Sequence, residues 1–315
     1  MTEGAPEVTV VLVSWNRRED LRIALDSLYE QTGVEFEIIV VDNGSTDGTI
    51  EMLESEPREI RVIKNKKNRG ACWGKNQGIL AARAPFLLFM DSDAQLISPH
   101  TMHTVLDRLK FDQGLTALGC PIYWNEELTE PWVFGIHLTE DFYIDWPKTR
   151  TLGLGADALS TCFLMMRTET AREIGGFDPV FFYQHEDLDF FVRLGKQGGR
   201  FDVLDSPPVW HRISQVGRKV DRWFWMHFRE EWRHQYMLIK NEGPVRAAIL
   251  IFRNWGDGKV MRDYYVRPIR LRKFVVLFGL LPIFLLLLSP LILWQGSKNY
   301  LENRSLVADS RRNGG

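Results

Sequence analysis

Short apolar runs that alternate with helical patterns are the feature of this sequence that most restricts its fold. Residues 8–13, 36–41 and 86–90 are rich in β-branched and other apolar side chains, as expected for buried parallel strands. Between the first two runs, Leu21 and Leu25 recur at the spacing of a helix. Strands that alternate with helices indicate βαβ units, so the sequence predicts an α/β fold with a doubly wound, mainly parallel sheet.

Polar residues follow the predicted strands. Asp42 follows the second run, Asn68 follows a short strand at residues 61–63, and Asp91 and Asp93 follow the last run. Right-handed crossovers bring the carboxyl ends of parallel strands to one edge of a sheet, so these side chains should meet in one crevice. Two carboxylates spaced two residues apart can hold Mg²⁺ or Mn²⁺ against a diphosphate. Aspartates after a strand also serve as turn or cap residues, so the D-x-D spacing by itself leaves both interpretations open.

The composition excludes several classes of protein. The 315 residues carry a formal net charge of −2 without a basic excess, which argues against nucleic acid as a partner. Cys72, Cys120 and Cys162 are widely spaced and form no C-x-x-C motif, so a disulfide or zinc framework is not expected. Neither the G-x-G-x-x-G fingerprint nor the Walker P-loop occurs, which disfavours dinucleotide oxidoreductases and P-loop NTPases.

The second half of the chain adds candidate site residues. Residues 124–152 are irregular and rich in aromatic side chains, which fits either an acceptor-binding wall or a flexible surface loop. Glu186 and Asp187 lie in the first turn of a predicted helix, where acidic residues also serve simply to complement the helix dipole. His211 follows a turn, and a lone histidine is more often structural than a metal ligand. Further strands are predicted at residues 116–123, 155–167 and 201–204.

The C-terminal part contains the longest apolar stretch. Residues 274–294 carry no charge and are long enough to span a bilayer as a helix. Pro282 and Pro290 would kink this helix, so a re-entrant or interfacial helix remains an alternative. The basic residues within 267–273 predict that the larger N-terminal part lies on the cytoplasmic side of the membrane. A basic and aromatic helix predicted at 218–241 either lies on the membrane lipid or packs back on the domain.

Six stretches fall in the order and at the spacing of the motifs of a known family. They are VTVVLVSWNR (8–17), VDNGSTDGT (41–49), NRGACWGKNQGI (68–79), FMDSDAQL (89–96), GGFDPVFFYQHEDLDFFVRL (175–194) and WHR (210–212). Through them the chain resembles the family 2 glycosyltransferases of the GT-A nucleotide-sugar-binding fold, and within that family the branch of rhamnosyl- and galactofuranosyl-transferases. The resemblance covers about residues 7–240 and implies a GT-A catalytic domain at 7–217. The residue pattern predicts a helical, basic-aromatic region at 218–273, and, outside the resemblance, a transmembrane or monotopic helix at 274–294 and a polar tail at 295–315.

The resemblance also implies a role for individual residues. Asp187 would be the catalytic base, and Glu186 would orient Asp187 or the acceptor. Asp93, Asp91 and His211 would bind Mg²⁺ or Mn²⁺, with Asp93 as a direct ligand and Asp91 nearer the ribose. The residues that would line the nucleotide-sugar donor are Ser14, Trp15, Asn16, Asp42, Asn68, Gly70, Asn76, Asp91 and Ser92.

The activity that the resemblance implies is metal-dependent, inverting sugar transfer. One sugar would move from a nucleotide-diphosphate donor to a hydroxyl of a glycan acceptor, in the synthesis of cell-surface polysaccharide or glycolipid. The apolar stretch 274–294 and its basic flank predict that this acceptor is linked to a lipid such as a polyprenyl diphosphate. The sequence departs from the Q-x-x-R-W motif of processive synthases, because Lys219 follows Arg218. It departs from polyprenyl-phosphate mannose synthases as well, because Asp42-Asn43 replaces a double aspartate. A non-catalytic, membrane-anchored module that binds nucleotide sugar or glycan, and a polyprenyl-phosphate glycosyltransferase, remain the alternatives.

Overall fold

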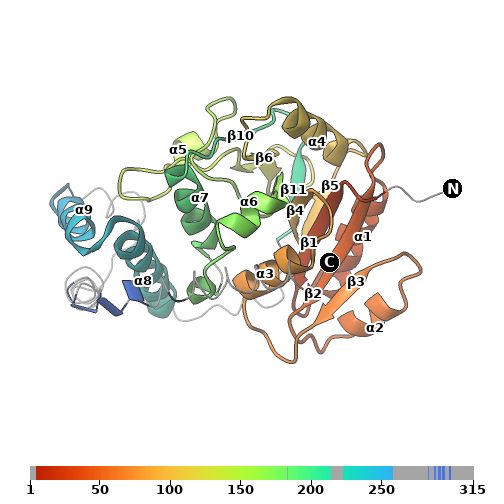
Figure 1. The fold of residues 1–315 in the computed structure, drawn as a ribbon, viewed down its shortest axis with the longest axis horizontal. Coiled ribbons are helices and arrows are strands. Elements are labelled where there is room, and N and C mark those ends of the chain that lie inside the picture. Colours follow the sequence, from red (N-terminus) through yellow and green to blue (C-terminus); the bar gives the residue numbers. More distant parts are fainter. Residues whose placement is uncertain are drawn as a thin grey trace. The chain divides into compact units, whose positions relative to one another are not determined.

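The computed structural model describes residues 5–182, 184–213 and 223–257, together with single residues between 283 and 298. The described residues form two compact units (Figure 1). The first unit contains residues 5–137 and 144–213, and the second contains residues 138–143 and 223–257. The finer division into four regions stays a prediction.

A seven-stranded sheet forms the centre of the first unit, in the order β10-β6-β9-β4-β1-β2-β3 (Figure 1). Its strands are β1 (Val8–Ser14), β2 (Phe36–Asp42), β3 (Arg61–Lys64), β4 (Phe86–Asp91), β6 (Ala117–Gly119), β9 (Phe163–Arg167) and β10 (Phe201–Val203). Only β9 runs antiparallel to its neighbours, β4 and β6, while the other pairs are parallel. The predicted α/β fold with a mainly parallel sheet is therefore confirmed.

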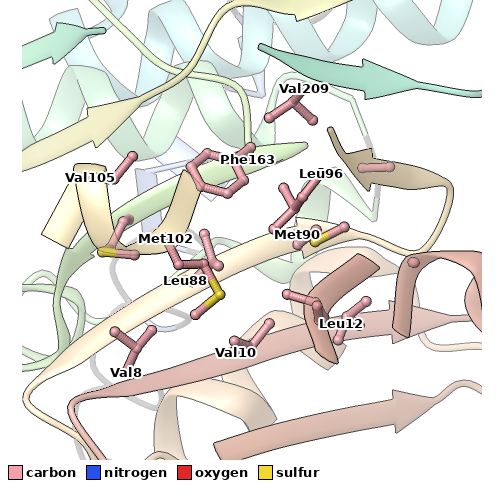
Figure 2. Packing of buried hydrophobic residues seen from close by; sticks show 14 of the residues in the cluster. Val8, Val10, Leu12, Leu88, Met90, Leu96, Met102, Val105, Phe163 and Val209 are labelled. Carbon is pink, nitrogen blue, oxygen red and sulfur yellow. The ribbon is translucent and has the colours of Figure 1, made fainter. Parts of the chain in front are cut away.

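Helices cover both faces of this sheet because successive side chains along a strand point to opposite faces. On one face, Val10 and Leu12 of β1 and Leu88 of β4 join a buried cluster with Met102 and Val105 (Figure 2). The last two residues belong to α4 (Thr101–Phe111), and α1 (Arg18–Tyr29) contributes a leucine stripe to the same cluster. The remaining helices of the first unit are α2 (Thr49–Glu54), α3 (Ala71–Ala81), α5 (Trp146–Thr149), α6 (Thr168–Glu173), a 3₁₀ turn at Pro179–Phe181, and α7 (Glu186–Lys196).

On the opposite face, aromatic rings and glycines let the helices approach the sheet closely. Phe89 of β4 packs edge-on against Phe177, with ring centroids 5.2 Å apart, and Phe177 stacks on Phe190 of α7 at 4.4 Å. Helix α3 lies against β1 through Gly78, where an added Cβ would lie only 2.3 Å from a methyl carbon of Val11. These contacts hold α3 and α7, which carry candidate site residues, beside the central strands.

We expect Gly78→Ala to lower the free energy of unfolding by about 1–3 kcal/mol, the usual cost of overpacking a core. This loss should appear even though alanine favours a helix over glycine by about 1 kcal/mol. Gly195→Ala in α7 is the matched control, because the nearest atom to an added Cβ there is 3.9 Å away. Urea denaturation of both variants checks the prediction, and equal stability of the two would contradict the close approach of α3 to β1.

A second, four-stranded sheet in the first unit has the order β5-β11-β7-β8. Its strands are β5 (Ala94–Leu96), β7 (Ile122–Tyr123), β8 (Pro131–Val133) and β11 (Val209–His211). Strand β11 pairs antiparallel with β5, so that His211 lies opposite Ala94. This register places His211 directly beside Asp93, which precedes β5, and so joins two positions that are far apart in the sequence.

Three predicted elements have different bounds in the structure. The strand expected at residues 116–123 is divided into β6 and β7, which belong to different sheets and are separated by Cys120 and Pro121. The strand expected at 155–167 is restricted to β9, since the register with β4 begins at Phe163. The irregular segment 124–152 contains β8 and the single-turn helix α5.

The second unit is helical in its described part. Helix α8 (Trp223–Glu242) confirms the predicted helix over 223–241, while residues 218–222 lie outside the described residues. Helix α9 (Pro244–Asp257) follows it after Gly243. The short segment 138–143 belongs to this unit, where Tyr143 stacks on His234 at 3.8 Å. None of the described helices is long and apolar enough to cross a bilayer. Most of the apolar stretch 274–294 and the tail after Lys298 lie outside the described residues.

Candidate active site

Three predicted metal ligands meet where the two sheets of the first unit adjoin. Asp91 ends β4, Asp93 lies in the turn before β5, and His211 ends β11. The Nε2 atom of His211 is 3.3 Å from Oδ1 of Asp93 and 3.9 Å from Oδ2 of Asp91. Asp93 and His211 are buried, whereas Asp91 is partly exposed. One divalent ion could therefore contact carboxylate and imidazole groups from three different strands or turns.

The charges of this cluster favour a cation. Burial and the neighbouring charge of Asp93 raise the pKa of the Asp91 carboxyl. Arg17, which directly follows a predicted donor-binding stretch, places Nη1 2.9 Å from Oδ2 of Asp93 and balances part of the charge. A divalent ion would relieve the remaining repulsion, and carboxylate oxygens are the ligands that Mg²⁺ and Mn²⁺ prefer. The residues present therefore fit such an ion, and Arg17 is a site residue that the sequence analysis did not select.

Aromatic rings fix the orientation of His211. Trp132 of β8 stacks on the imidazole with ring centroids 4.4 Å apart, and Trp124 lies nearly parallel to it at 6.1 Å. The indole Nε1 of Trp210 donates a hydrogen bond of 3.2 Å to the carbonyl of Trp124. Part of the aromatic segment 124–152 therefore packs around the metal cluster, although its predicted role as an acceptor wall stays a prediction.

A second polar cluster surrounds Asp187 in the first turn of α7. Thr161 donates twice to this carboxylate, from its backbone N–H to Oδ2 at 3.1 Å and from Oγ1 to Oδ1 at 2.8 Å. The buried ammonium of Lys75 lies 3.1 Å from Oε1 of Glu186 and 3.5 Å from Oδ1 of Asp187. Its Nζ also lies 2.5 Å from Oγ1 of Thr161. Lys75 of α3 thus contacts both carboxylates, and Thr161, in the segment before β9, holds Asp187 in addition.

The sequence analysis did not select Lys75 or Thr161. Lys75 lies within the stretch NRGACWGKNQGI, so its place in a recognised motif was a usable signal. Thr161 carried no signal, because only the antiparallel insertion of β9 beside β4 brings it to Asp187.

Electrostatics connect the two clusters. Burial raises the pKa of the Asp187 carboxyl, and the charge of Lys75 opposes this rise. Burial alone would lower the pKa of Lys75, but the charges of Asp187 and Glu186 outweigh it and raise that pKa, so the amine stays protonated. The charge of Asp187 also contributes to the raised pKa of Asp91. The backbone agrees, because Asp91 N donates to the carbonyl of Cys162 at 3.1 Å and the preceding residue, Thr161, donates to Asp187 at 3.1 Å. The candidate base and the candidate metal ligands therefore lie close together.

The turn that leads into α7 has an unusual backbone. Phe182, Gln184 and His185 have φ angles of 60°, 66° and 63°, a region that non-glycine residues rarely adopt. The carbonyl of Phe182 accepts a hydrogen bond of 2.7 Å from Ala71 N, at the start of α3. Gly70 is required there, because an added Cβ would lie 2.6 Å from that carbonyl oxygen. Such strained turns cluster at functional sites, and this one sets where Asp187 projects.

Two of the predicted donor-binding side chains carry unsatisfied polar atoms. Ser14 and Asp42 lie opposite each other in the β1–β2 register, and both are buried. The Oδ1 atom of Asp42 accepts hydrogen bonds of 2.9 Å from the backbone N–H groups of Gly44 and Ser45. Among the described residues, Oδ2 of Asp42 and Oγ of Ser14 have no hydrogen-bond partner. A ligand with N–H or O–H groups at this sheet edge would satisfy them.

Other predicted donor contacts make hydrogen bonds within the chain. Asn16 accepts from Thr46 N at 2.7 Å, and Asn68 accepts from Gly70 N at 2.8 Å, so each stabilises a loop that follows a strand of the sheet. Asn76 accepts from Phe177 N and donates to its carbonyl, both at 2.8 Å, and so holds the loop before α7. Contacts of these three amides with a ribose or diphosphate stay predictions. Of the remaining two positions, Ser92 is buried and Trp15 is exposed.

The sequence and fold are similar to those of known proteins. The glycosyl transferase family 2 profile matches residues 9–175, which leaves Glu186, Asp187 and His211 outside the matched range. An uncharacterized glycosyltransferase of Haemophilus influenzae is 33% identical over 190 residues, which are 59% of this chain and 61% of that protein. The uncharacterized glycosyltransferase YfnE of Bacillus subtilis is 43% identical over 90 residues, 28% of this chain and 23% of that protein. The matches span less than two thirds of these relatives.

Solved structures share the fold. The mannosyltransferase of Pyrobaculum calidifontis in complex with GDP-Man and Mn²⁺ aligns with a TM-score of 0.56 at 16% identity, over 99% of this chain and 80% of that one. Residues 1–349 of S. aureus TarS in complex with UDP-GlcNAc align with a TM-score of 0.59 at 16% identity, over 98% of this chain and 92% of that one. The fold is thus α/β and GT-A-like, and because the family profile covers more than half of its length, the chain belongs to glycosyl transferase family 2.

Proposed function

We propose that this chain transfers one sugar from a nucleotide-diphosphate donor to an acceptor hydroxyl, with a divalent metal and with inversion at the anomeric carbon. The observation that carries the proposal is the pairing of two clusters in one site. The metal cluster of Asp91, Asp93 and His211 suits a divalent ion and a diphosphate. Asp187 is held near it, because Thr161 N donates to Asp187 and the carbonyl of the next residue, Cys162, accepts from Asp91 N. Leaving-group stabilisation and proton removal are the two tasks that this reaction requires.

The metal cluster would serve the leaving group. Asp93 and His211, with Asp91 beside them, would hold Mg²⁺ or Mn²⁺. When bound, the ion supplies positive charge that neutralises the diphosphate as it leaves the sugar. Arg17, now paired with Asp93 at 2.9 Å, provides a second positive charge at the same place.

Asp187 would accept the proton of the attacking acceptor hydroxyl. Burial raises the pKa of Asp187, whereas the hydrogen bonds from Thr161 and the charge of Lys75 favour its ionised form and orient the carboxylate. Glu186, the adjacent carboxylate, is buried and paired with Lys75 at 3.1 Å, so it does not present a second free nucleophile. With Asp187 as the single base of this cluster, the acceptor hydroxyl would displace the nucleotide diphosphate directly, and the anomeric carbon would be inverted.

The donor would bind along the carboxyl ends of β1 and β2. The unsatisfied Oδ2 of Asp42 and Oγ of Ser14 suit the N–H groups of a nucleobase and the O–H groups of a ribose. The two structural neighbours named above were solved with GDP-Man and with UDP-GlcNAc, which supports a nucleotide sugar as the donor class. Within that class we propose a donor of the rhamnosyl- or galactofuranosyl-transferase type, on the sequence motifs alone.

We also propose that the acceptor is a glycan or polyprenyl-diphosphate-linked sugar at the cytoplasmic face of a membrane. The proposal rests on the apolar stretch 274–294 and on the basic residues that precede it. One relative, the succinoglycan biosynthesis protein ExoO of Rhizobium meliloti, is 33% identical over 107 residues, which supports a place in polysaccharide synthesis. A donor screen with membrane lipid extracts, read by mass spectrometry of the products, identifies both substrates.

Removal of the metal should abolish transfer. With the donor and acceptor found in that screen, EDTA should reduce activity to background, and Mn²⁺ or Mg²⁺ should restore it. His211→Ala should raise the metal concentration needed for half activation by about 10–100-fold, the scale on which changes around a metal alter its affinity.

The matched control is His100→Ala, since His100 is exposed and its ring contacts only Thr32 Oγ1 among the described polar groups. Full activity in EDTA would exclude the metal-dependent mechanism. Donor binding without any turnover would instead favour a non-catalytic binding module.

A further inference from the structure

A cysteine thiol lies beside the metal cluster, although Mg²⁺ and Mn²⁺ do not require a sulfur ligand. Among the described residues, one ligand atom each from Asp91, Cys162 and His211 lie within 4.8 Å of one another. Cys162 immediately precedes β9, and its side chain is fully buried. Its carbonyl accepts a hydrogen bond of 3.1 Å from Asp91 N, which fixes the two residues side by side.

The three ligand atoms of Asp91, Cys162 and His211 prefer a different metal ion from the one that the Asp93 carboxylate prefers. Sulfur, imidazole nitrogen and carboxylate oxygen together are typical ligands of Zn²⁺, which binds three protein groups and leaves a fourth position open in catalytic sites. Thiolates select Zn²⁺ and similar ions, whereas Mg²⁺ and Mn²⁺ prefer oxygen ligands. Asp93, by contrast, is already paired with Arg17 at 2.9 Å.

We propose that this site has two overlapping ligand sets, so that Zn²⁺ or another thiophilic ion binds Asp91, Cys162 and His211 and thereby inhibits the enzyme. The proposal rests on the proposed function, because inhibition requires that Mg²⁺ or Mn²⁺ use Asp93 and the shared His211 for transfer. On binding, the thiol of Cys162 gives its proton to solvent and the thiolate forms a bond to the metal. His211 is then taken from the activating ion, and Asp93 keeps its pair with Arg17.

The competing explanation is that Cys162 is only a buried apolar side chain. Its burial beside Phe163 and Met165 in the hydrophobic cluster of the sheet fits that explanation as well. The two explanations differ in whether a metal bound in the site contacts sulfur, and a spectrum can detect this contact directly.

Titration of the full-length protein with Co²⁺ is the decisive experiment. Cobalt bound to a thiolate shows a charge-transfer absorption in the near ultraviolet, and we expect this band in the wild-type protein. Stoichiometric Zn²⁺ should remove the band, and excess Mg²⁺ should not. Cys162→Ser should lose it, while Cys120→Ser should keep it, because Cys120 is an equally buried thiol outside the cluster.

Bound cobalt without this band in the wild-type protein would overturn the proposal, even if the variants failed to fold. An unchanged band in Cys162→Ser or Cys162→Ala would do the same. In Mn²⁺-supported transfer, Cys162→Ser should raise the Zn²⁺ concentration for half inhibition by about 10–100-fold. If sugar transfer requires Mn²⁺ but the cobalt-loaded protein shows no sulfur band, the zinc proposal fails and the proposed function stands. If the band is present but no donor sugar is transferred, the proposed function fails and the zinc proposal loses only its inhibitory role.

Discussion

Asp187→Asn is expected to reduce kcat for sugar transfer by about 10²–10⁴-fold, the usual contribution of a general base. Asparagine cannot accept the proton of the acceptor hydroxyl, although it has nearly the size of aspartate. Donor binding should change little, because the predicted donor contacts lie on or beside β1, β2, α3 and β4 rather than on α7. Single-turnover rates, together with the equilibrium affinity for the donor, measure the two effects separately.

The contacts of Thr161 with Asp187 predict how much stability the Asp187→Asn variant should lose. It donates to both oxygens of Asp187, and asparagine keeps only one acceptor oxygen, so one of the two hydrogen bonds is lost. A thermal unfolding scan should therefore show a modest loss of stability and a retained cooperative transition. Asp107→Asn, at an exposed carboxylate of α4, controls for the loss of one negative charge.

Glu186→Gln separates the roles of the two adjacent carboxylates. Glu186 is paired with Lys75 at 3.1 Å, so we expect its loss to act through the position of Lys75 and Asp187 and to be smaller than the loss in Asp187→Asn. Near-normal turnover in Asp187→Asn would show that another group removes the proton.

The sequence predicted the parts of this fold that local patterns control. Runs such as residues 8–13 and 36–41 are mostly buried and nearly all apolar, so their sequences clearly indicate parallel strands, and the structure pairs them as β1 and β2. The bounds of β6, β7 and β9 were less accurate, because these short strands depend on partners that are distant in the chain. The residues between these strands are neither clearly apolar nor clearly polar, so the local sequence does not specify which sheet each strand joins.

In the candidate site, too, the residues that local patterns place were predicted, and those that depend on distant strand pairing were not predicted from such patterns. Asp42, Asp91 and Asp93 could be placed at one sheet edge because parallel strands end there. His211 entered only through the family resemblance, and the pairing of β11 with β5 gives the physical reason for its position beside Asp93. Cys162 carried no pattern in the sequence, since one residue before an antiparallel strand shows neither a period nor a motif.

Lys75→Met is expected to move the acidic limb of the pH profile of kcat/KM to higher pH. Burial raises the pKa of Asp187 and the charge of Lys75 opposes that rise, so removal of the charge lets the pKa rise further. An opposite charge at this distance shifts a carboxyl pKa by about 1–3 units, and the limb should move by a shift of that size. A protonated Asp187 cannot act as the base, so activity should fall at a higher pH than in the wild-type protein and recover in part as the pH rises.

A purely structural role for Lys75 would lower activity at every pH without moving the limb. Lys75→Arg, which keeps the positive charge, should leave the limb near its original pH, and Lys64→Met should too, because Lys64 is an exposed partner of Glu54. Removing one partner of a buried ion pair costs about 3–5 kcal/mol, so Lys75→Met requires a check of folding. Thr161→Val is the second variant: it removes a hydrogen bond to the ionised carboxylate, keeps the charge of Lys75, and should move the limb in the same direction by less. If neither variant moves the limb, the ionisation of Asp187 does not control the reaction.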